Sequence, residues 1–319
     1  MTILSHITDA IGRTPLVRLA GIARHTRVPV LVKCEHMNPG GSVKDRIARA
    51  ILEDAEARGV LARGATLVEA TAGNTGMGLA LVAASRGYRL VCVMPEKMSV
   101  DKRAALAALG AEVIVTPNAP PSSADNFRNV AERLARERGG FLTDQFRAPA
   151  NVRVHEETTA REILDAVPDL GAFVAGAGTG GTITGVGRVL ARERPSTRVV
   201  LADPIGSALA DWIETGTPGA DGSYLVEGIG GSEPPPLLDR TLIHAAERVS
   251  DDESFETARR LAQQEGLFVG GSAGTNVAAA IRIAMRDDVR GPVVTVLPDG
   301  LDRYRAQPWM KHWSEPRAK

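Results

Sequence analysis

Short apolar runs alternate with longer amphipathic segments along most of the chain. The apolar runs predict strands at residues 28–35, 65–71, 88–95, 112–117, 172–175, 198–202 and 292–297. The segments between them repeat apolar residues at helical spacing, which predicts helices at 44–59, 77–86, 99–109, 125–138, 155–166, 182–193, 251–265 and 274–286. Ser99 is the expected N-cap of one helix, and Gly87 and Gly110 are expected to end two others.

Strands rich in Val and Leu that alternate with helices are typical of parallel sheets covered on both faces. The chain has 319 residues, which is too long for one small doubly wound sheet. We therefore predict an α/β protein with two doubly wound domains, parallel sheets and a cleft between the domains. The irregular stretch 215–238 is rich in glycine and proline and is expected to be a functional loop.

Composition and charge exclude several classes of protein. Lys and Arg together number 38, as do Asp and Glu, so bulk charge gives no support for a nucleic-acid or membrane partner. No run approaches the roughly 18 apolar residues of a membrane span, and the N-terminus does not resemble a signal peptide. The two cysteines, Cys34 and Cys92, lie in predicted strands and are expected to be buried, reduced thiols. We expect a cytoplasmic protein.

One glycine-rich turn matches a dinucleotide-binding fingerprint. In GAGTGGTITG (176–185), Gly176, Gly178 and Gly181 fit G-x-G-x-x-G between a strand and a helix, and Asp203 follows at the end of a later strand. By itself this pattern points to an NAD-dependent oxidoreductase, although nothing else in the chain supports hydride transfer.

Two further turns place polar groups at helix starts. In NPGGSVKDR (38–46), Ser42 can cap a helix whose first turn holds Lys44. The helix dipole favours a neutral amine there, although a solvated lysine is the commoner case. In TAGNTGMG (71–78), backbone N–H groups and side-chain donors can bind a carboxylate or a phosphate, unless the loop is only a helix cap.

Two other motifs fit hydrolytic or metal chemistry poorly. GGSAGTN (270–276) lacks the spacing of a nucleophile elbow, which argues against a hydrolase serine at Ser272. HEETT (155–159) lacks the second histidine of a zinc helix, so no metal site is expected.

Taken in order, these motifs closely resemble the pyridoxal-phosphate enzymes of the cysteine synthase and cystathionine β-synthase family. The resemblance runs from IGRTPLVRL (11–19) through NPGGSVKDR, TAGNTG, GTGGT, EGIG (227–230) and GGSAG to LPDGLDRY (297–304). It implies fold type II, like the tryptophan synthase β subunit, with a cofactor cleft between the domains, and a homodimer. It also implies an N-terminal segment (1–40) that packs on the larger domain, a smaller substrate-gripping domain (41–150) and a larger phosphate-binding domain (151–319).

The resemblance assigns the site residue by residue. Lys44 matches the catalytic lysine that holds pyridoxal 5′-phosphate as an internal aldimine, and Asn74 the residue that hydrogen-bonds its 3′-oxygen. Ser272 matches the serine that faces the pyridine nitrogen. The matches to the phosphate cradle are Gly178, Thr179, Gly180, Gly181 and Thr182. The matches to the substrate-binding positions are Thr71, Ala72, Gly73, Thr75, Gln145, Gly228 and Gly230. Asp203 then becomes an ordinary strand-end residue.

The family chemistry implies β-replacement on O-acetyl-L-serine or L-serine by a sulfur nucleophile, through an aminoacrylate intermediate. Lys44 would act as the general base, and the neutral hydroxyl of Ser272 would favour prompt β-elimination. The expected partners are thus an amino-acid substrate and a sulfur nucleophile.

Two departures from the family pattern leave the nucleophile open. Ala72 stands where serine is usual, and EGIG is followed by Gly231 instead of an aromatic residue. A non-sulfur nucleophile is therefore an alternative. A serine or threonine dehydratase is another, although Val43 and Thr179 argue against it, and a non-catalytic partner protein is a third.

Overall fold

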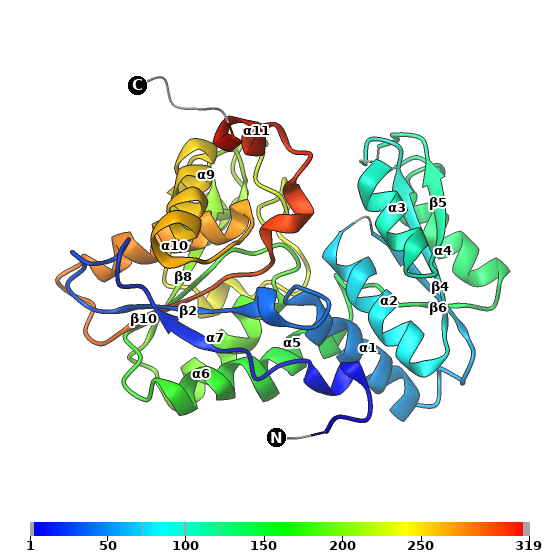
Figure 1. Cartoon of the computed structure of the whole chain (residues 1–319), viewed down its shortest axis with the longest axis horizontal. Coiled ribbons are helices and arrows are strands. Elements are labelled where there is room, and N and C mark those ends of the chain that lie inside the picture. The colour runs from blue at the N-terminus through cyan, green and yellow to red at the C-terminus, as the bar shows by residue number, and fades with distance from the viewer. Residues whose placement is uncertain (1–2, 72, 99, 121, 315–319) are drawn as a thin grey trace. The chain divides into compact units, whose positions relative to one another are not determined.

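The computed structural model describes residues 3–71, 73–98, 100–120 and 122–314 (Figure 1). Two compact units emerge. The first contains the described residues up to Gly12 together with Asn38–Val154, and the second contains Arg13–Met37 and the described residues from His155 onward. The chain therefore leaves the first unit, contributes a short segment to the second, and returns. The roles expected for residues 1–40, 41–150 and 151–319 stay predictions.

The first unit contains a parallel sheet of four described strands in the order β5-β4-β3-β6. The strands are β3 (Thr66–Ala70), β4 (Arg89–Pro95), β5 (Glu112–Thr116) and β6 (Phe141–Leu142). The helices are η1 (Ile7–Ala10), α1 (Lys44–Ala57), α2 (Asn74–Arg86), α3 (Val100–Ala108), α4 (Phe127–Glu137) and α5 (Pro149–Val154).

Successive residues of these strands face opposite sides, so each strand serves two cores. Leu67 and Cys92 pack with side chains from α1, α2 and α3, whereas Val68 and Val91 pack against α4. This arrangement explains why the strands are apolar at nearly every position. It confirms the prediction of a parallel sheet with helices on both faces.

The second unit contains a sheet of six described strands in the order β1-β2-β10-β7-β8-β9. The strands are β1 (Leu16–Arg18), β2 (Val30–Lys33), β7 (Ala172–Ala175), β8 (Arg198–Pro204), β9 (Ala245–Val249) and β10 (Val293–Val296). The helices are η2 (Glu35–Met37), the π-helix η3 (His155–Thr159), α6 (Ala160–Ala166), α7 (Gly181–Glu193), α8 (Leu209–Thr215), η4 (Arg240–Leu242), α9 (Asp251–Arg260), the π-helix η5 (Leu261–Glu265), α10 (Gly271–Ala284), η6 (Leu301–Tyr304) and α11 (Pro308–Ser314).

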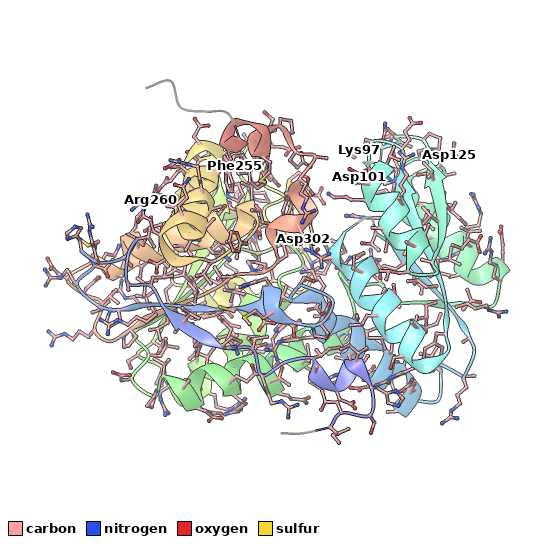
Figure 2. The ribbon with its side chains drawn as sticks, in the orientation of Figure 1. Lys97, Asp101, Asp125, Phe255, Arg260 and Asp302 are labelled. Atoms are coloured by element: carbon pink, nitrogen blue, oxygen red, sulfur yellow. The ribbon has the colours of Figure 1, made fainter. Side chains whose placement is uncertain are left out.

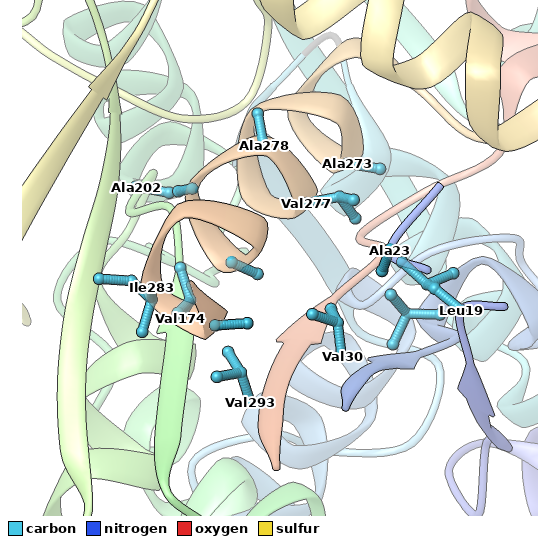
Figure 3. Close-up of a cluster of buried hydrophobic side chains, with 14 of the residues drawn as sticks. Leu19, Ala23, Val30, Val174, Ala202, Ala273, Val277, Ala278, Ile283 and Val293 are labelled. Atoms are coloured by element: carbon cyan, nitrogen blue, oxygen red, sulfur yellow. The ribbon is translucent and has the colours of Figure 1, made fainter. Parts of the chain in front are cut away.

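One face of this second sheet is covered by α10. Ala273, Val277 and Ile283 of α10 pack against strand residues such as Val174 and Val293 (Figure 3). The other face packs against α6, α7 and α8. Edge strand β1 runs antiparallel to β2, and the remaining pairs are parallel.

Aromatic side chains tie the C-terminal helix to α9. Phe255 of α9 (labelled in Figure 2) stacks on Trp309 of α11 with ring centroids 4.6 Å apart. Trp313 meets Trp309 edge-on at 5.2 Å. Ile229, from the predicted functional loop, belongs to the same buried cluster, so this cluster also anchors that loop.

Most predicted elements are confirmed, with shifted ends. The helix predicted at 155–166 begins instead at Pro149 and includes the π-turn η3, and the helix predicted at 274–286 begins at Gly271. The expected cap Ser99 lies outside the described residues, whereas Gly87 and Gly110 adopt the left-handed conformation expected at helix ends. Strand β9 was not predicted, because its sequence AAERV has few β-branched residues.

Cys34 and Cys92 are buried and free, as expected. Burial raises the pKa of the Cys34 thiol to about 11 and that of Cys92 to about 12. In the described residues, no helix combines the length and apolar character that a membrane crossing requires.

Helix α10 packs tightly against α9 at a glycine. A Cβ on Gly274 would lie 1.8 Å from the carbonyl oxygen of Ser254. We therefore predict that Gly274→Ala lowers the free energy of unfolding by about 3 kcal/mol, because the helices must separate. Ser254→Ala, which loses only the 2.7 Å hydroxyl contact with Thr275, should cost about 1 kcal/mol. Chemical denaturation of both variants measures the difference, and an equal loss would contradict the packing argument.

Candidate functional site

The start of α1 places Lys44 as predicted. Asn38 to Gly41 form a turn in which the Gly41 N–H donates to the Asn38 carbonyl at 2.7 Å. The Ser42 hydroxyl accepts a 3.2 Å hydrogen bond from the Lys44 backbone N–H, and Lys44 is the first residue of α1. The helix therefore starts where NPGGSVKDR predicts, although its N-cap is Val43 and Ser42 lies one residue before the cap.

Helix α2 begins beside this position in the first unit. A Cβ on Gly78 would lie 3.0 Å from the backbone oxygen of Lys44 and 3.2 Å from the Ala48 methyl group. Glycine at this position lets the first turns of the two helices approach closely. The structure thus brings the Lys44 helix start and the Asn74 helix start together.

The loop before α2 presents backbone N–H and hydroxyl groups at a helix start. The Thr71 hydroxyl accepts a 3.2 Å bond from the Gly73 N–H, and Gly73 precedes Asn74, the first residue of α2. The first N–H groups of a helix lack partners within the helix and attract anions. Ala72, the remaining predicted residue of this loop, lies outside the described residues.

Gln145 reaches this loop from a distant part of the chain. The buried Thr75 hydroxyl donates to the side-chain oxygen of Gln145 at 2.6 Å. The Asn151 side chain donates to the Gln145 backbone oxygen at 2.8 Å. The structure therefore brings together Thr75 and Gln145, two of the predicted substrate-binding residues.

The glycine turn 178–182 begins helix α7 in the second unit. Gly180 is left-handed at φ 84°, and α7 starts at Gly181. A Cβ on Gly178 would lie 2.2 Å from the Gly228 carbonyl oxygen, and the Gly230 N–H donates to the Ala177 carbonyl at 2.9 Å. The predicted loop residues Gly228 and Gly230 thus lie against this turn, with φ values of 88° and 81°.

A buried histidine supports the same turn. His155 begins the π-helix η3; its Nδ1 lies 2.9 Å from the Thr159 hydroxyl, and its Nε2 lies 3.2 Å from the Thr182 hydroxyl. A proton on Nε2 would let His155 donate to Thr182, leaving the Thr182 hydrogen for an anion. The sequence suggests only a metal-binding role for His155. The π-turn that orients its ring toward Thr182 cannot be predicted from the sequence.

Helix α10 presents Ser272 in its first turn. Ser272 is 3% exposed, and its hydroxyl makes no hydrogen bond with any residue that the structure describes. A hydroxyl that no described residue engages can bond to a ligand. Four residues further along α10, Asn276 accepts from the Gly176 N–H at 2.7 Å and donates to the Val296 carbonyl at 2.9 Å. Asn276, also missed in the sequence, thereby fixes α10 to the start of the glycine turn.

Asp203 is not the ordinary strand-end residue that was expected. It is fully buried at the end of β8, and it accepts a 2.8 Å bond from the Ala210 N–H in the first turns of α8. Burial raises the pKa of its carboxyl group to about 6. Asp203 therefore fixes α8 to the sheet.

Comparison with known proteins shows which protein family this chain belongs to. The family model for pyridoxal-phosphate dependent enzymes matches residues 7–299. Cystathionine beta-synthase of Apis mellifera is 42% identical over 325 residues, which is 99% of this chain and 63% of that protein. This chain therefore belongs to the family of pyridoxal-phosphate dependent enzymes. It spans less than two thirds of the length of that curated relative.

Two solved structures are similar over almost their full length. The structure of O-ureido-L-serine synthase has a TM-score of 0.89 and 39% identity, covering 100% of this chain and 98% of its own. The O-acetylserine dependent cystathionine beta-synthase from Helicobacter pylori has a TM-score of 0.86 and 35% identity, covering 96% and 99%. Both similarities support the expected fold type II.

The residues of the second unit fit the phosphate and the pyridine ring of this cofactor. Backbone N–H groups of a glycine turn at a helix N-terminus suit a phosphate. At Gly178 the Gly228 carbonyl takes the place that a side chain would need, so the turn stays open to a ligand only as glycine. The Ser272 hydroxyl, without a protein partner among the described residues, suits a ring nitrogen.

A methyl group at Gly178 tests this cradle. We expect Gly178→Ala to weaken cofactor binding by at least about tenfold, or about 1.4 kcal/mol, because the new Cβ pushes the Gly228 carbonyl away. Titration of cofactor-free protein with pyridoxal phosphate, followed by absorbance, measures the change. Gly187→Ala, in the helix α7 that follows this turn, has its nearest contact at 3.3 Å; it is the control and should bind normally. Equal affinities would contradict the cradle.

Proposed function

We propose that this enzyme catalyses β-replacement on O-acetyl-L-serine or L-serine by a sulfur nucleophile, as a cysteine synthase or cystathionine β-synthase. The carrying observation is the position of Ser272, a residue 3% exposed in the first turn of α10, whose hydroxyl makes no hydrogen bond with a described residue. A neutral group opposite the pyridine nitrogen favours elimination over transamination. The names of the similar proteins support the same class of reaction.

Pyridoxal phosphate, when bound, makes the α-proton of an amino acid acidic. The proposal assigns removal and return of that proton to Lys44 Nζ, acting as a general base. The N–H groups at the start of α2, with Thr71, Gly73, Thr75 and Gln145, bind the α-carboxylate. Asn74 holds the 3′-oxygen of the cofactor, residues 178–182 hold its phosphate, and Gly228 and Gly230 border the substrate.

A second lysine provides a useful contrast. Lys33 on β2 is 1% exposed, and its ammonium group pairs with Glu162 at 2.6 Å. An ion-paired ammonium group is a poor nucleophile, since the neutral amine is the reactive form. The structure therefore offers no comparable reason to assign the cofactor to Lys33.

We predict that Lys44→Ala eliminates the visible absorbance of the covalently held cofactor and all turnover. Borohydride reduction followed by peptide mass spectrometry should find the cofactor mass on the Lys44 peptide of the wild type and on no peptide of the variant. Lys97→Ala, which changes an exposed lysine of the same unit (labelled in Figure 2), is the control. Cofactor trapped on another lysine of the wild type would refute the assignment.

A non-sulfur nucleophile is the second candidate. Gly231 follows Gly230 where an aromatic residue is usual, and one similar structure is an O-ureido-L-serine synthase, whose name implies an oxygen nucleophile. We expect sulfide or homocysteine to give the highest kcat/KM in a steady-state panel. The panel combines O-acetylserine, O-phosphoserine and serine with sulfide, thiosulfate, homocysteine, an amine and N-hydroxyurea. A preference for N-hydroxyurea would select the second candidate, and steady pyruvate release from serine without a nucleophile would indicate a dehydratase.

We also propose a cytoplasmic homodimer. The family resemblance supports the dimer, and two buried, reduced cysteines support a reducing compartment. Light scattering coupled to size-exclusion chromatography measures the assembly.

A further inference from the structure

The loop 228–231 is held between two segments of the second unit. On one side, the Gly230 N–H donates to the Ala177 carbonyl at 2.9 Å, which fixes the loop to the start of the glycine turn. On the other side lies the connection 205–208, which joins β8 to α8. None of the roles assigned above uses the contacts on this second side.

Ser207 and its neighbour make those contacts. The Ser207 hydroxyl oxygen accepts a 3.1 Å hydrogen bond from the Gly231 N–H, and the hydroxyl donates to the Gly231 carbonyl at 3.3 Å. The Ala208 N–H donates to the same carbonyl at 2.9 Å. Both backbone polar groups of Gly231 are therefore bonded to two consecutive residues at the start of α8. We call these three hydrogen bonds the latch.

Ser207 is itself fixed by the start of α8. Its hydroxyl oxygen also accepts from the N–H of Leu209, the first residue of that helix, at 3.2 Å. The buried Asp203 carboxyl group accepts from the Ala210 N–H at 2.8 Å and fixes the same helix to the sheet. The latch therefore connects the loop 228–231 to a helix end that the sheet holds in place.

The latch engages residue 231 through its backbone alone. Gly231 stands where an aromatic residue is usual, so no side chain at this position can anchor the end of the loop. Glycine also loses more conformational freedom than any other residue when it is ordered. The order of this part of the loop therefore depends on the backbone bonds that Ser207 and Ala208 supply.

We propose that Ser207 is a positioning residue that holds the loop 228–231 in place, and thereby sets the affinity for the nucleophile. This inference rests on the function proposed above, which places Gly228 and Gly230 beside the substrate. The amino-acid donor has further partners in that proposal, because its carboxylate is assigned to the start of α2, whereas the nucleophile has none. A loop that is already ordered loses less conformational entropy when a ligand binds.

Ser207→Ala removes the hydroxyl of the latch and is the decisive variant. The assay uses homocysteine or sulfide, whichever gives the higher kcat/KM with the wild type. We expect the nucleophile KM to rise about fivefold, the value of one hydrogen bond, and kcat and the donor KM to change less than about twofold. Ser207→Thr keeps the hydroxyl and should keep the nucleophile KM near the wild-type value. Ser223→Ala, which changes an exposed serine of the same unit, is the control. An unchanged nucleophile KM in Ser207→Ala would overturn the proposal.

A second control separates the latch from the stability of α8, because Ser207 also bonds to the first residue of that helix. Thr215 makes comparable contacts at the other end of α8, where its hydroxyl donates to the Asp211 carbonyl at 2.8 Å and accepts from the Thr217 N–H at 3.1 Å. Thr215→Val should lower stability as Ser207→Ala does, and leave the nucleophile KM unchanged. Equal increases in that KM in the two variants would overturn the proposal.

Hydrogen exchange gives a readout that does not depend on activity. In the holoenzyme, peptides that contain residues 228–231 should exchange at least about fivefold faster in Ser207→Ala than in the wild type. The same peptides should exchange at the wild-type rate in Ser223→Ala and Thr215→Val. Unchanged exchange in Ser207→Ala would overturn the latch, and faster exchange with an unchanged nucleophile KM would overturn its link to binding. A wild-type enzyme that uses no sulfur nucleophile would instead overturn the proposed function, and the exchange rates would still test the latch.

Discussion

Backbone-to-backbone contact at helix starts is the constraint on which the candidate residues of each unit depend. Gly78 lets α2 lie against the Lys44 carbonyl, Gly178 lets the glycine turn lie against the Gly228 carbonyl, and Gly274 lets α10 lie against α9. A methyl group would overlap the facing carbonyl oxygen at Gly178 and Gly274, and it would be a tight contact at 3.0 Å at Gly78. Helix N-termini bind anions through their free N–H groups. Close packing between neighbouring segments therefore also determines where those groups point.

The elements closest to the site were the most predictable from the sequence. Buried parallel strands are continuous apolar runs, and the glycines that begin α7 must be glycines for steric reasons, so both leave strong local patterns. The placement of Lys44 at the start of α1 followed from the turn that precedes it. The pairing of Thr75 with Gln145 could be expected only from the family resemblance, because 70 residues separate them.

The supporting residues were not predictable, for physical reasons. Glu69, His155 and Asn276 are buried polar residues, and each has at least one partner 27 to 100 residues away along the chain. No local pattern distinguishes a carboxyl group buried on a strand from one on the surface. Asp203 is a different case. Once its role as a ribose ligand is rejected, nothing in the sequence indicates that it is buried. Its buried carboxyl group instead caps a helix.

The π-helix η3 restricts where this part of the chain can accept an inserted residue. It spans His155–Thr159, and the same helical segment continues as α6, where Ile163 is fully buried against the sheet. The wide turn lets His155 face Thr182 while Ile163 faces the core. An extra residue in α6 between Thr159 and Ile163 would rotate Ile163 about the helix axis by about 100° relative to His155. Such an insertion would turn either Ile163 away from the core or His155 away from Thr182.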